Sequence, residues 1–286
     1  MKHPQIGLAL GSGAAKGLAH IGVIKTLEAN DIPIDYIAGS SIGALIGAHY
    51  GAFKDTKRLE EISNTFNRRQ GFRLFDPTFV GGLVKGKKFE RFIEEMLEGA
   101  TFQTLQIPLA VVATNFHTAQ PVIFQDGDLT KAIRASTSAP AFFQPIMYQD
   151  TLLADGGLSN PVPVDLVKTM GADITIGVNL DTVYSENKLL PTPSLTKVPL
   201  HSINILRHNL SLQSTKTADV TISPRGAYDI GFIGWNFFFD TEKAKTVIEA
   251  GEKAAEKMIP ELREIIEKKQ KEKSRLRKFF SFFKRD

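Results

Sequence analysis

The sequence of 286 residues contains no cysteine. Disulfide bonds, thiolate nucleophiles and cysteine-ligated metals are therefore excluded. No apolar run approaches the roughly 20 residues that cross a bilayer, and Met1–Gln5 leads into a run too short for the apolar core of a signal peptide. No cluster of aspartate, glutamate and histidine suggests a metal site, so we expect no cofactor. We expect a soluble protein whose body lies in the cytoplasm.

The net positive charge of the chain comes from its C-terminal end. Residues 268–286 hold nine Lys or Arg and two acidic residues, and this surplus leaves −3 for residues 1–267 out of the whole chain's +4. The hydrophobic content of 42% allows one large core. We therefore expect one domain over residues 1–267, with a helical insert at about 54–100, and a basic and aromatic tail at 268–286.

The tail joins its basic run to four phenylalanines, Phe279, Phe280, Phe282 and Phe283. A bilayer interface takes up such rings while lysine and arginine meet lipid phosphates. We expect the tail to bind an anionic membrane surface, which places the protein at the inner face of the cell membrane. The alternatives are a solubilising tail whose rings fold back on the body, and a nucleic-acid-binding tail. We expect no nucleic acid partner, because the body is slightly acidic.

The sequence Gly39-Ser40-Ser41-Ile42-Gly43 follows a short apolar run and precedes a helix of small residues. Glycines two before and two after Ser41 fit the G-x-S-x-G nucleophile elbow, a strained strand-to-helix turn that leaves no room for a Cβ. The spacing selects Ser41 as the nucleophile, with Gly39 and Gly43 as supporting residues. The alternative is that Ser40 or Ser41 only caps the helix.

A second glycine-rich turn, Gly11–Gly17, joins the predicted strand Gln5–Leu10 to a helix at Leu18–Ala29. Its last glycine is one residue too far for G-x-G-x-x-G, and no P-loop Lys-Ser/Thr follows. If the first two strands are neighbours, both turns open at the same sheet edge. We therefore expect an oxyanion hole and substrate contacts from Gly11, Gly13 and Ala14, with added positive charge from Lys16. A solvated lysine is the alternative for Lys16.

Asp155 ends an apolar run and is followed by Gly156 and Gly157. This position suits a functional carboxylate, because the two glycines let backbone and substrate approach closely. The alternative is a plain Asp-Gly turn, a dipeptide that recurs at Asp126-Gly127.

The other segments give weaker signals. The insert carries apolar residues that either form a packed subdomain or cover the site, namely Leu59, Ile62, Phe66, Phe72, Leu74, Phe75 and Phe79. Periodicity predicts strands at Ile107–Asn115, Pro121–Phe124 and Ala218–Ser223, and helices at Leu129–Ser136 and Leu200–Gln213, with one final helix from Asp240 onward.

The ordered set of glycine-rich loop, elbow and Asp155-Gly156-Gly157 resembles the patatin-like phospholipase family, small bacterial members in particular. Ile133–Ser136 and Asn160–Asp165 add to the likeness, which covers about residues 5–180. The resemblance implies a three-layer α/β fold with a mostly parallel central sheet, and a Ser41–Asp155 dyad without a catalytic histidine. Ser12 and Ala14 stand where the family usually has glycine, and Lys16 stands where it usually has arginine.

We therefore expect a serine esterase or lipid acyl hydrolase, phospholipase-like or lysophospholipase-like, that acts on a lipid or other ester through an acyl-enzyme. One rival is an α/β-hydrolase type of Ser-Asp-His triad, which takes His201 or His208 as its base. The other rival is a non-catalytic membrane-surface protein on the same fold.

Overall fold

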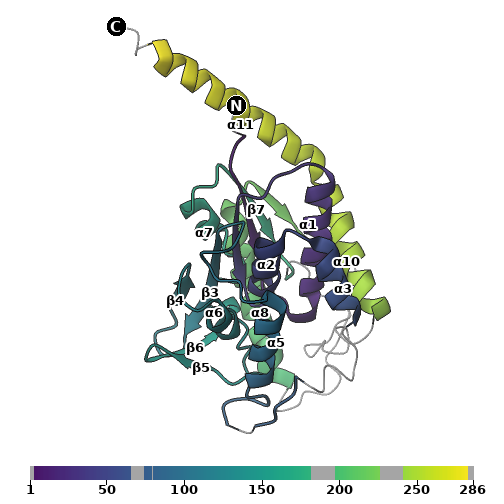
Figure 1. Ribbon diagram of the computed structural model, residues 1–286, viewed down its shortest axis with the longest axis vertical. Helices are drawn as coiled ribbons and strands as arrows, with labels where there is room; N and C mark the ends of the chain where they lie inside the picture. Colours follow the sequence, from purple (N-terminus) through teal and green to yellow (C-terminus); the bar gives the residue numbers. More distant parts are fainter. Residues whose placement is uncertain (1–2, 66–73, 79, 182–196, 226–240, 283–286) are drawn as a thin grey trace.

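The computed structural model describes residues 3–65, 74–78, 80–181, 197–225 and 241–282. Its centre is a sheet with helices on both faces, and a long helix at the C-terminal end projects away from the rest (Figure 1). The α/β class predicted from the sequence, with a mostly parallel sheet between helices, is confirmed.

The described residues form an eight-stranded sheet with the order β5-β6-β3-β2-β1-β7-β8, and β4 pairs with β3. The parallel strands are β1 (Ile6–Leu10), β2 (Tyr36–Ser40), β3 (Leu109–Asn115), β7 (Ile174–Val178) and β8 (Val220–Ile222). The antiparallel strands β4 (Pro121–Phe124), β5 (Ile146–Tyr148) and β6 (Thr151–Asp155) lie at one side. The expected pairing of the first two strands is confirmed, and it brings their carboxyl ends together.

Both faces of the parallel strands are buried, as their near-continuous apolar runs require. In β1, Ile6, Leu8 and Leu10 belong to the main core, whereas Ala9 belongs to a smaller cluster on the opposite face. The main core lies beneath α1 (Ala19–Ala29), α2 (Ile42–Phe53), α3 (Thr56–Thr65), α5 (Lys87–Leu97), α6 (Leu129–Ser136) and α10 (Thr241–Glu256). The smaller cluster lies beneath α7 (Val164–Thr169), so the strands are enclosed between two helical layers.

The expectation of one final helix is wrong, because the chain forms α10 and then a separate α11 (Ile259–Phe282). Pro260 lies in the first turn of α11, where its missing N–H breaks no hydrogen bond. Helix α10 packs tightly on α1: a Cβ built on Gly22 would lie 2.0 Å from the Ile248 carbonyl oxygen. Among the described helices, none has the length and apolarity needed to cross a membrane.

Helix α11 runs along the edge of the sheet where the parallel strands begin. Lys273 pairs with Asp173, which directly precedes β7, and Arg263 donates to the Asn30 side chain at 3.1 Å. The helix crosses the tail boundary expected at residue 267 without a break, and the side chains of the four tail phenylalanines lie outside the described residues. The glycine-rich loop and the elbow lie at the opposite, carboxyl edge.

Candidate active site

Ser41 lies alone between the end of β2 and the start of α2. Its backbone has φ 55° and ψ −123°, a conformation that costs a non-glycine residue strain and that clusters at functional sites. A Cβ on Gly39 would lie 2.5 Å from Ala44, and one on Gly43 would lie 2.2 Å from the Leu10 carbonyl oxygen. Both glycines of the motif are therefore required by close backbone contacts.

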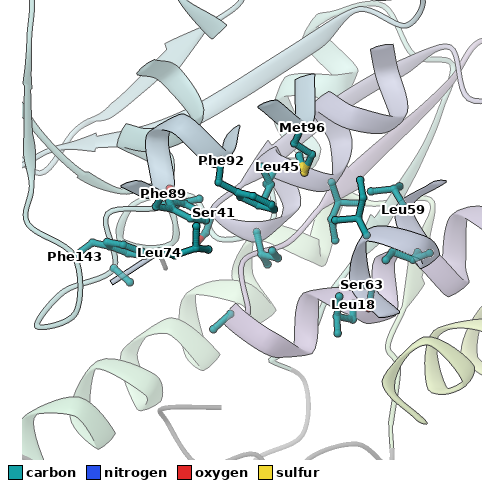
Figure 2. Close-up of a pocket in the computed structure, with 17 residues that line it drawn as sticks. Leu18, Ser41, Leu45, Leu59, Ser63, Leu74, Phe89, Phe92, Met96 and Phe143 are labelled. Atoms are coloured by element: carbon teal, nitrogen blue, oxygen red, sulfur yellow. The ribbon is translucent and has the colours of Figure 1, made fainter. Parts of the chain in front are cut away.

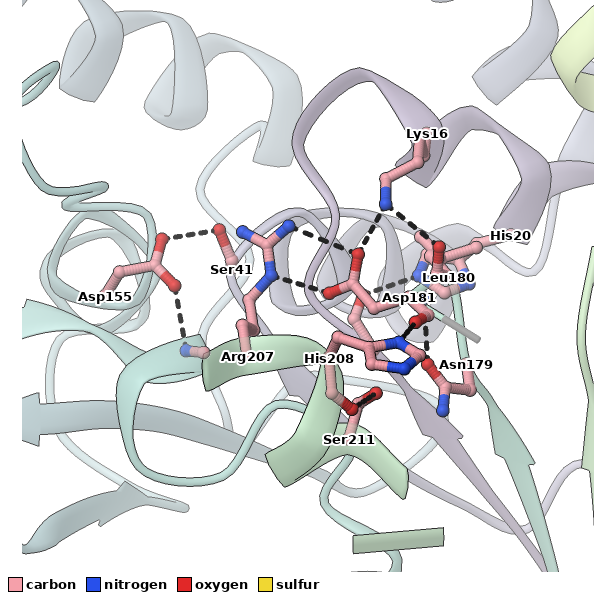
Figure 3. Close-up of polar contacts among 12 residues, drawn as sticks. Lys16, His20, Ser41, Asp155, Asn179, Leu180, Asp181, Arg207, His208 and Ser211 are labelled. Atoms are coloured by element: carbon pink, nitrogen blue, oxygen red, sulfur yellow. Dashed lines mark hydrogen bonds and ion pairs between the residues drawn. The ribbon is translucent and has the colours of Figure 1, made fainter. Parts of the chain in front are cut away.

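Asp155 lies at the end of β6, whose antiparallel pairing with β3 carries the carboxylate to the elbow. The Ser41 hydroxyl donates to Asp155 Oδ2 at 2.7 Å, and the Gly157 amide donates to Asp155 Oδ1 at 2.8 Å (Figure 3). Ser41 is 8% exposed and Asp155 is 6% exposed. The two side chains that the sequence singled out, 114 residues apart, form one hydrogen-bonded pair.

Burial raises the pKa of Asp155 above its ordinary value of 3.8. The hydrogen bonds from Ser41 and Gly157 and the positive charge of Arg207 act against this rise, because all three favour the carboxylate. A carboxylate with a raised pKa is a stronger base toward an alcohol than one exposed to water. The pair therefore has the geometry and the electrostatics of a nucleophile beside a general base.

The segment Arg134–Ser138 accepts hydrogen bonds from the backbone amides of both Ser41 and Asp155. The Ser41 amide donates to Ser136 Oγ at 2.8 Å, and the Asp155 amide donates to the Ser138 carbonyl at 3.1 Å. Arg134 is buried and donates to Ser138 Oγ and to the carbonyls of residues 85, 86 and 144. Ser136 and Arg134 belong to the stretch that resembled the family, yet no pattern in the sequence predicted these contacts.

The glycine-rich loop divides into an anchored part and an open part. The Gly11 amide donates to Val178 and the Ser12 amide donates to Pro161. Within the described residues, the amides of Gly13 and Ala14 have no hydrogen-bond acceptor, and Ala14 lines the same cavity as Ser41. Gly11 thus anchors the loop to the sheet, whereas Gly13 and Ala14 carry unpaired donors, that of Ala14 at the cavity that Ser41 also lines.

The departures from the usual glycine pattern are accommodated differently. Ala14 has φ 49°, in the left-handed region that glycine would adopt without strain. Ser12 is buried next to the aspartate turn, because a Cβ on Gly157 would lie 2.7 Å from its hydroxyl oxygen. Lys16 donates to the Leu180 carbonyl at 3.0 Å and pairs with the Asp181 carboxylate.

A buried ionic cluster lies beside the Ser41–Asp155 pair, and sequence reasoning did not find it. Arg207, on α8 (Lys197–Ser214), donates from Nε and Nη2 to Asp181 at 2.6 and 3.2 Å. Burial alone would raise the pKa of Asp181, but Arg207 and Lys16 hold it well below its ordinary value. A single arginine within a helix has no spacing signature, so no motif pointed to Arg207.

The histidines take other roles. His20 and His49 are fully buried, and burial lowers the pKa of each to about 4. His20 Nε2 contacts the Gly11 carbonyl at 2.7 Å, and His208 Nδ1 contacts the Asp181 carbonyl. In the described part of the chain, the hydrogen-bond partner of the Ser41 hydroxyl is Asp155 and not a histidine.

An apolar cavity of about 120 Å³ opens at Ser41 and runs between α1, α2, α3 and α5 (Figure 2). Its lining includes Leu18, Leu45, Leu59, Ile62, Leu74, Phe89, Phe92, Met96 and Phe143. Among the predicted insert residues, Leu59, Ile62 and Leu74 line the cavity, Phe75 is exposed, and Phe66, Phe72 and Phe79 lie outside the described residues. An apolar cavity of ~150 Å³ binds benzene, so this space suits part of an alkyl chain.

The described residues contain no group of three or more side chains that would hold a metal ion. The arrangement combines a serine hydroxyl, a buried carboxylate, two unpaired amides and an apolar cavity at one sheet edge.

A protein-family model and several individual proteins match this chain. A family model described as patatin-like phospholipase matches residues 8–168. An uncharacterized NTE family protein of Mycobacterium tuberculosis is 37% identical over 182 residues, which are 62% of this chain and 49% of that protein. Lysophospholipase nte1 of Aspergillus fumigatus is 33% identical over 183 residues, 62% of this chain and 12% of that protein. The chain thus spans about half the length of the mycobacterial relative.

Among solved structures, VipD from Legionella pneumophila superposes with a TM-score of 0.59. The match covers 91% of this chain and 67% of VipD, at 12% sequence identity. At this identity the likeness concerns the fold.

Proposed function

Because the chain belongs to the patatin-like phospholipase family, we propose that it is a lipid acyl hydrolase in which Ser41 and Asp155 form the catalytic pair. The observation that carries this proposal is the 2.7 Å hydrogen bond from the Ser41 hydroxyl to the buried Asp155 carboxylate, at the mouth of an apolar cavity. The name of the fungal relative, lysophospholipase, supports the same class of reaction.

In the proposed reaction, Ser41 Oγ attacks the ester carbonyl and its proton passes to Asp155 Oδ2. The amides of Gly13 and Ala14 donate to the negative oxygen of the tetrahedral intermediate. The intermediate collapses, the alcohol leaves with the proton held by Asp155, and an acyl-enzyme remains. Water then attacks the acyl group, gives its proton to Asp155, and releases the fatty acid as Ser41 recovers its proton.

The cavity fits the acyl side of the substrate. Ser41 is one of its few polar lining residues, and helices α3 and α5 of the insert supply much of the apolar wall. An alkyl chain placed there leaves the water that it would order and lies against Leu, Ile, Phe and Met side chains. The insert is thus proposed to contribute to substrate binding as well as to the core.

The activity is tested by incubating the purified full chain with a lysophospholipid in neutral detergent micelles and measuring released fatty acid. We expect release that scales with enzyme concentration. Release no faster than from heat-denatured protein, on both lysophospholipid and short soluble esters, would contradict the proposed function.

The reaction should lose rate on the acid side with an apparent pKa above 3.8, the ordinary value for an aspartate. Asp155 must be ionised to accept the Ser41 proton, and burial raises its pKa. The activity is therefore present above the pKa of Asp155 and falls as the pH drops through it. The measurement is kcat/KM for a soluble ester across the acid range, with circular dichroism to exclude unfolding. A profile flat down to the ordinary aspartate value would contradict a buried aspartate base.

We also propose that the basic and aromatic tail holds the protein at an anionic membrane surface. Each basic residue near such a surface contributes about 1 kcal/mol before screening, and residues 268–286 carry a surplus of seven. Helix α11 projects away from the body (Figure 1) and contacts the edge where the strands begin. Ser41 lies at the other edge, about 16 Å away for strands of five residues. The tail would thus hold the protein at the membrane surface, while Ser41 lies at the opposite edge of the sheet.

Truncation after Gln270 should abolish most co-sedimentation with vesicles that contain anionic lipid, and so should replacement of the four tail phenylalanines with serine. Raising the salt concentration should weaken binding of the full chain, because screening shortens the reach of the charges. Hydrolysis of a soluble ester serves as the control for folding and should persist in both variants. Equal sedimentation of all three proteins, or binding that needs no anionic lipid, would show that the tail is not the anchor.

A further inference from the structure

Arg207 is held rigidly beside the catalytic pair. Its Nε and Nη2 donate to the two oxygens of Asp181, and its side chain is 19% exposed while that of Asp181 is 6% exposed. Two parallel hydrogen bonds to one carboxylate fix the plane of a guanidinium group. The residue lies on α8, beyond the 8–168 segment that the family model matches.

The remaining edge of the guanidinium faces the reaction centre. Within the described residues, Nη1 of Arg207 has no hydrogen-bond acceptor. Figure 3 shows the group between Asp181 and the Ser41–Asp155 pair, and Arg207 and Asp155 are close enough for each charge to shift the pKa of the other. A partly accessible donor edge of a fixed cation therefore lies next to the nucleophile.

Arg207 and its partner Asp181 both act on the base. Burial raises the pKa of Asp155; the charge of Arg207 lowers this pKa, and the charge of the paired Asp181 raises it, so the ion pair has opposing effects on the acceptor of the Ser41 proton. Lys16 lies on the other side of Asp181 and also donates to the Leu180 carbonyl. Arg207 and Lys16 share the single carboxylate of Asp181, so this ionic cluster carries a net positive charge beside the serine, which favours binding of an anion there.

Ser41 lies between the apolar part of the site, which is the cavity, and the charged part, which contains Arg207 and Asp181. It lines the apolar cavity, which contains neither Arg207 nor Asp181 among its lining residues, and it also bonds to Asp155 beside Arg207. A glycerophospholipid has the matching order of groups: an alkyl chain, an ester carbonyl and then, across the glycerol, a phosphate. A planar guanidinium with a free edge is well suited to phosphate oxygens.

We propose that Arg207, held by Asp181, binds the phosphate of a glycerophospholipid substrate while the acyl chain lies in the cavity, and so selects phospholipid esters over neutral glycerides. This inference rests on the proposed lipid acyl hydrolase function. Arg207 is a specificity-determining residue in this scheme, and Asp181 is a positioning residue.

The test compares kcat/KM for oleoyl lysophosphatidylglycerol and for monooleoylglycerol in the same neutral detergent micelles. Arg207→Gln should lower the ratio of the two values at least about tenfold, because a charged hydrogen bond to the phosphate is lost only with the first substrate. Arg263→Gln is the matched control, since Arg263 also bonds to a side chain but lies at the opposite sheet edge, on α11. It should leave the ratio within about twofold, as expected for a distant surface change.

A second variant guards against misfolding. Asp181→Asn combined with Lys16→Gln and Arg207→Gln replaces the whole buried ionic cluster by neutral amides, because Lys16 also pairs with Asp181 and must not be left as an unpaired charge. It should show the same loss of ratio. A third measurement needs no lipid: inorganic phosphate should compete with a neutral soluble ester in the unmodified protein, and compete at least about fivefold less in Arg207→Gln, because the anion loses its charged donor.

A ratio that stays within about twofold in both variants would overturn the assignment of Arg207. Competition by free phosphate together with an unchanged lipid ratio would mean that the site binds free phosphate only, which also overturns it. If the unmodified protein hydrolyses neither lipid, the proposed function itself fails. That outcome is distinct, because it is seen before any variant is made.

Discussion

Replacing Ser41 with alanine should lower the hydrolysis of short p-nitrophenyl esters by about 10⁴-fold or more, as removal of a serine nucleophile does in other hydrolases. Alanine fits the elbow, where the serine side chain makes its hydrogen bond to Asp155. The backbone at φ 55° is equally strained for either residue. The fold should therefore persist while the acyl-enzyme can no longer form. The measurement is the initial rate, together with labelling by a fluorophosphonate probe and mapping of the modified residue.

Ser40→Ala is the matched control for this change. Ser40 is adjacent, buried, and its hydroxyl has no hydrogen-bond partner within the described residues. The control should keep its rate within about fivefold, since it removes no group that the proposed reaction uses. Activity of Ser41→Ala within a few fold of the unmodified protein would refute the nucleophile assignment, and probe attached to Ser40 would show that the elbow register is different.

Replacing Asp155 with asparagine should lower the rate by roughly 10²- to 10⁴-fold, the usual contribution of a general base. Asparagine has nearly the same shape and still accepts a hydrogen bond from Gly157, but it cannot take the proton of Ser41. The pair is buried, so water does not readily substitute for the lost carboxylate. The measurement is kcat/KM for a soluble ester, with the melting temperature recorded in parallel.

Two kinds of control separate the dyad from a histidine triad. His201→Ala and His208→Ala should each change the rate less than about tenfold, below the effect of losing a base. Asp126→Asn alters the other Asp-Gly turn, which is exposed, and should leave the rate within about twofold. A large loss at either histidine would favour the triad over the dyad, and a small loss at Asp155 would contradict the dyad.

The two carboxylates near Ser41 show how environment separates chemically identical groups. Asp155 is buried, hydrogen-bonded by a hydroxyl and an amide, and its pKa is raised. Asp181 is equally buried but lies between Arg207 and Lys16, which hold its pKa low. The first is suited to accept a proton, whereas the second remains ionised and orients a cation. The different protonation behaviour of these two aspartates therefore follows from the charged and hydrogen-bonding groups around each of them.

The motifs that the sequence revealed are those whose geometry is local. The G-x-S-x-G turn needs glycines because Gly39 and Gly43 touch backbone a few residues away or on the adjacent strand. Adjacent strands then bring the Gly11–Gly17 loop to the same edge, as parallel order predicts. Such features depend on short-range steric contacts and on the order of neighbouring strands, so a single sequence is enough to predict them.

Tertiary structure decided what local geometry does not fix. It determined that the Gly11 amide donates a hydrogen bond to the neighbouring strand, while the amides of Gly13 and Ala14 are unpaired. It also determined that Phe89 and Met96 line the cavity, whereas Phe75 is exposed. It also brought Arg207 and Lys16 to Asp181. These contacts join residues far apart in sequence, and they depend on the packing register of whole helices. Because a side chain's partners are set by that register and not by its neighbours in the chain, no spacing within the sequence could predict them.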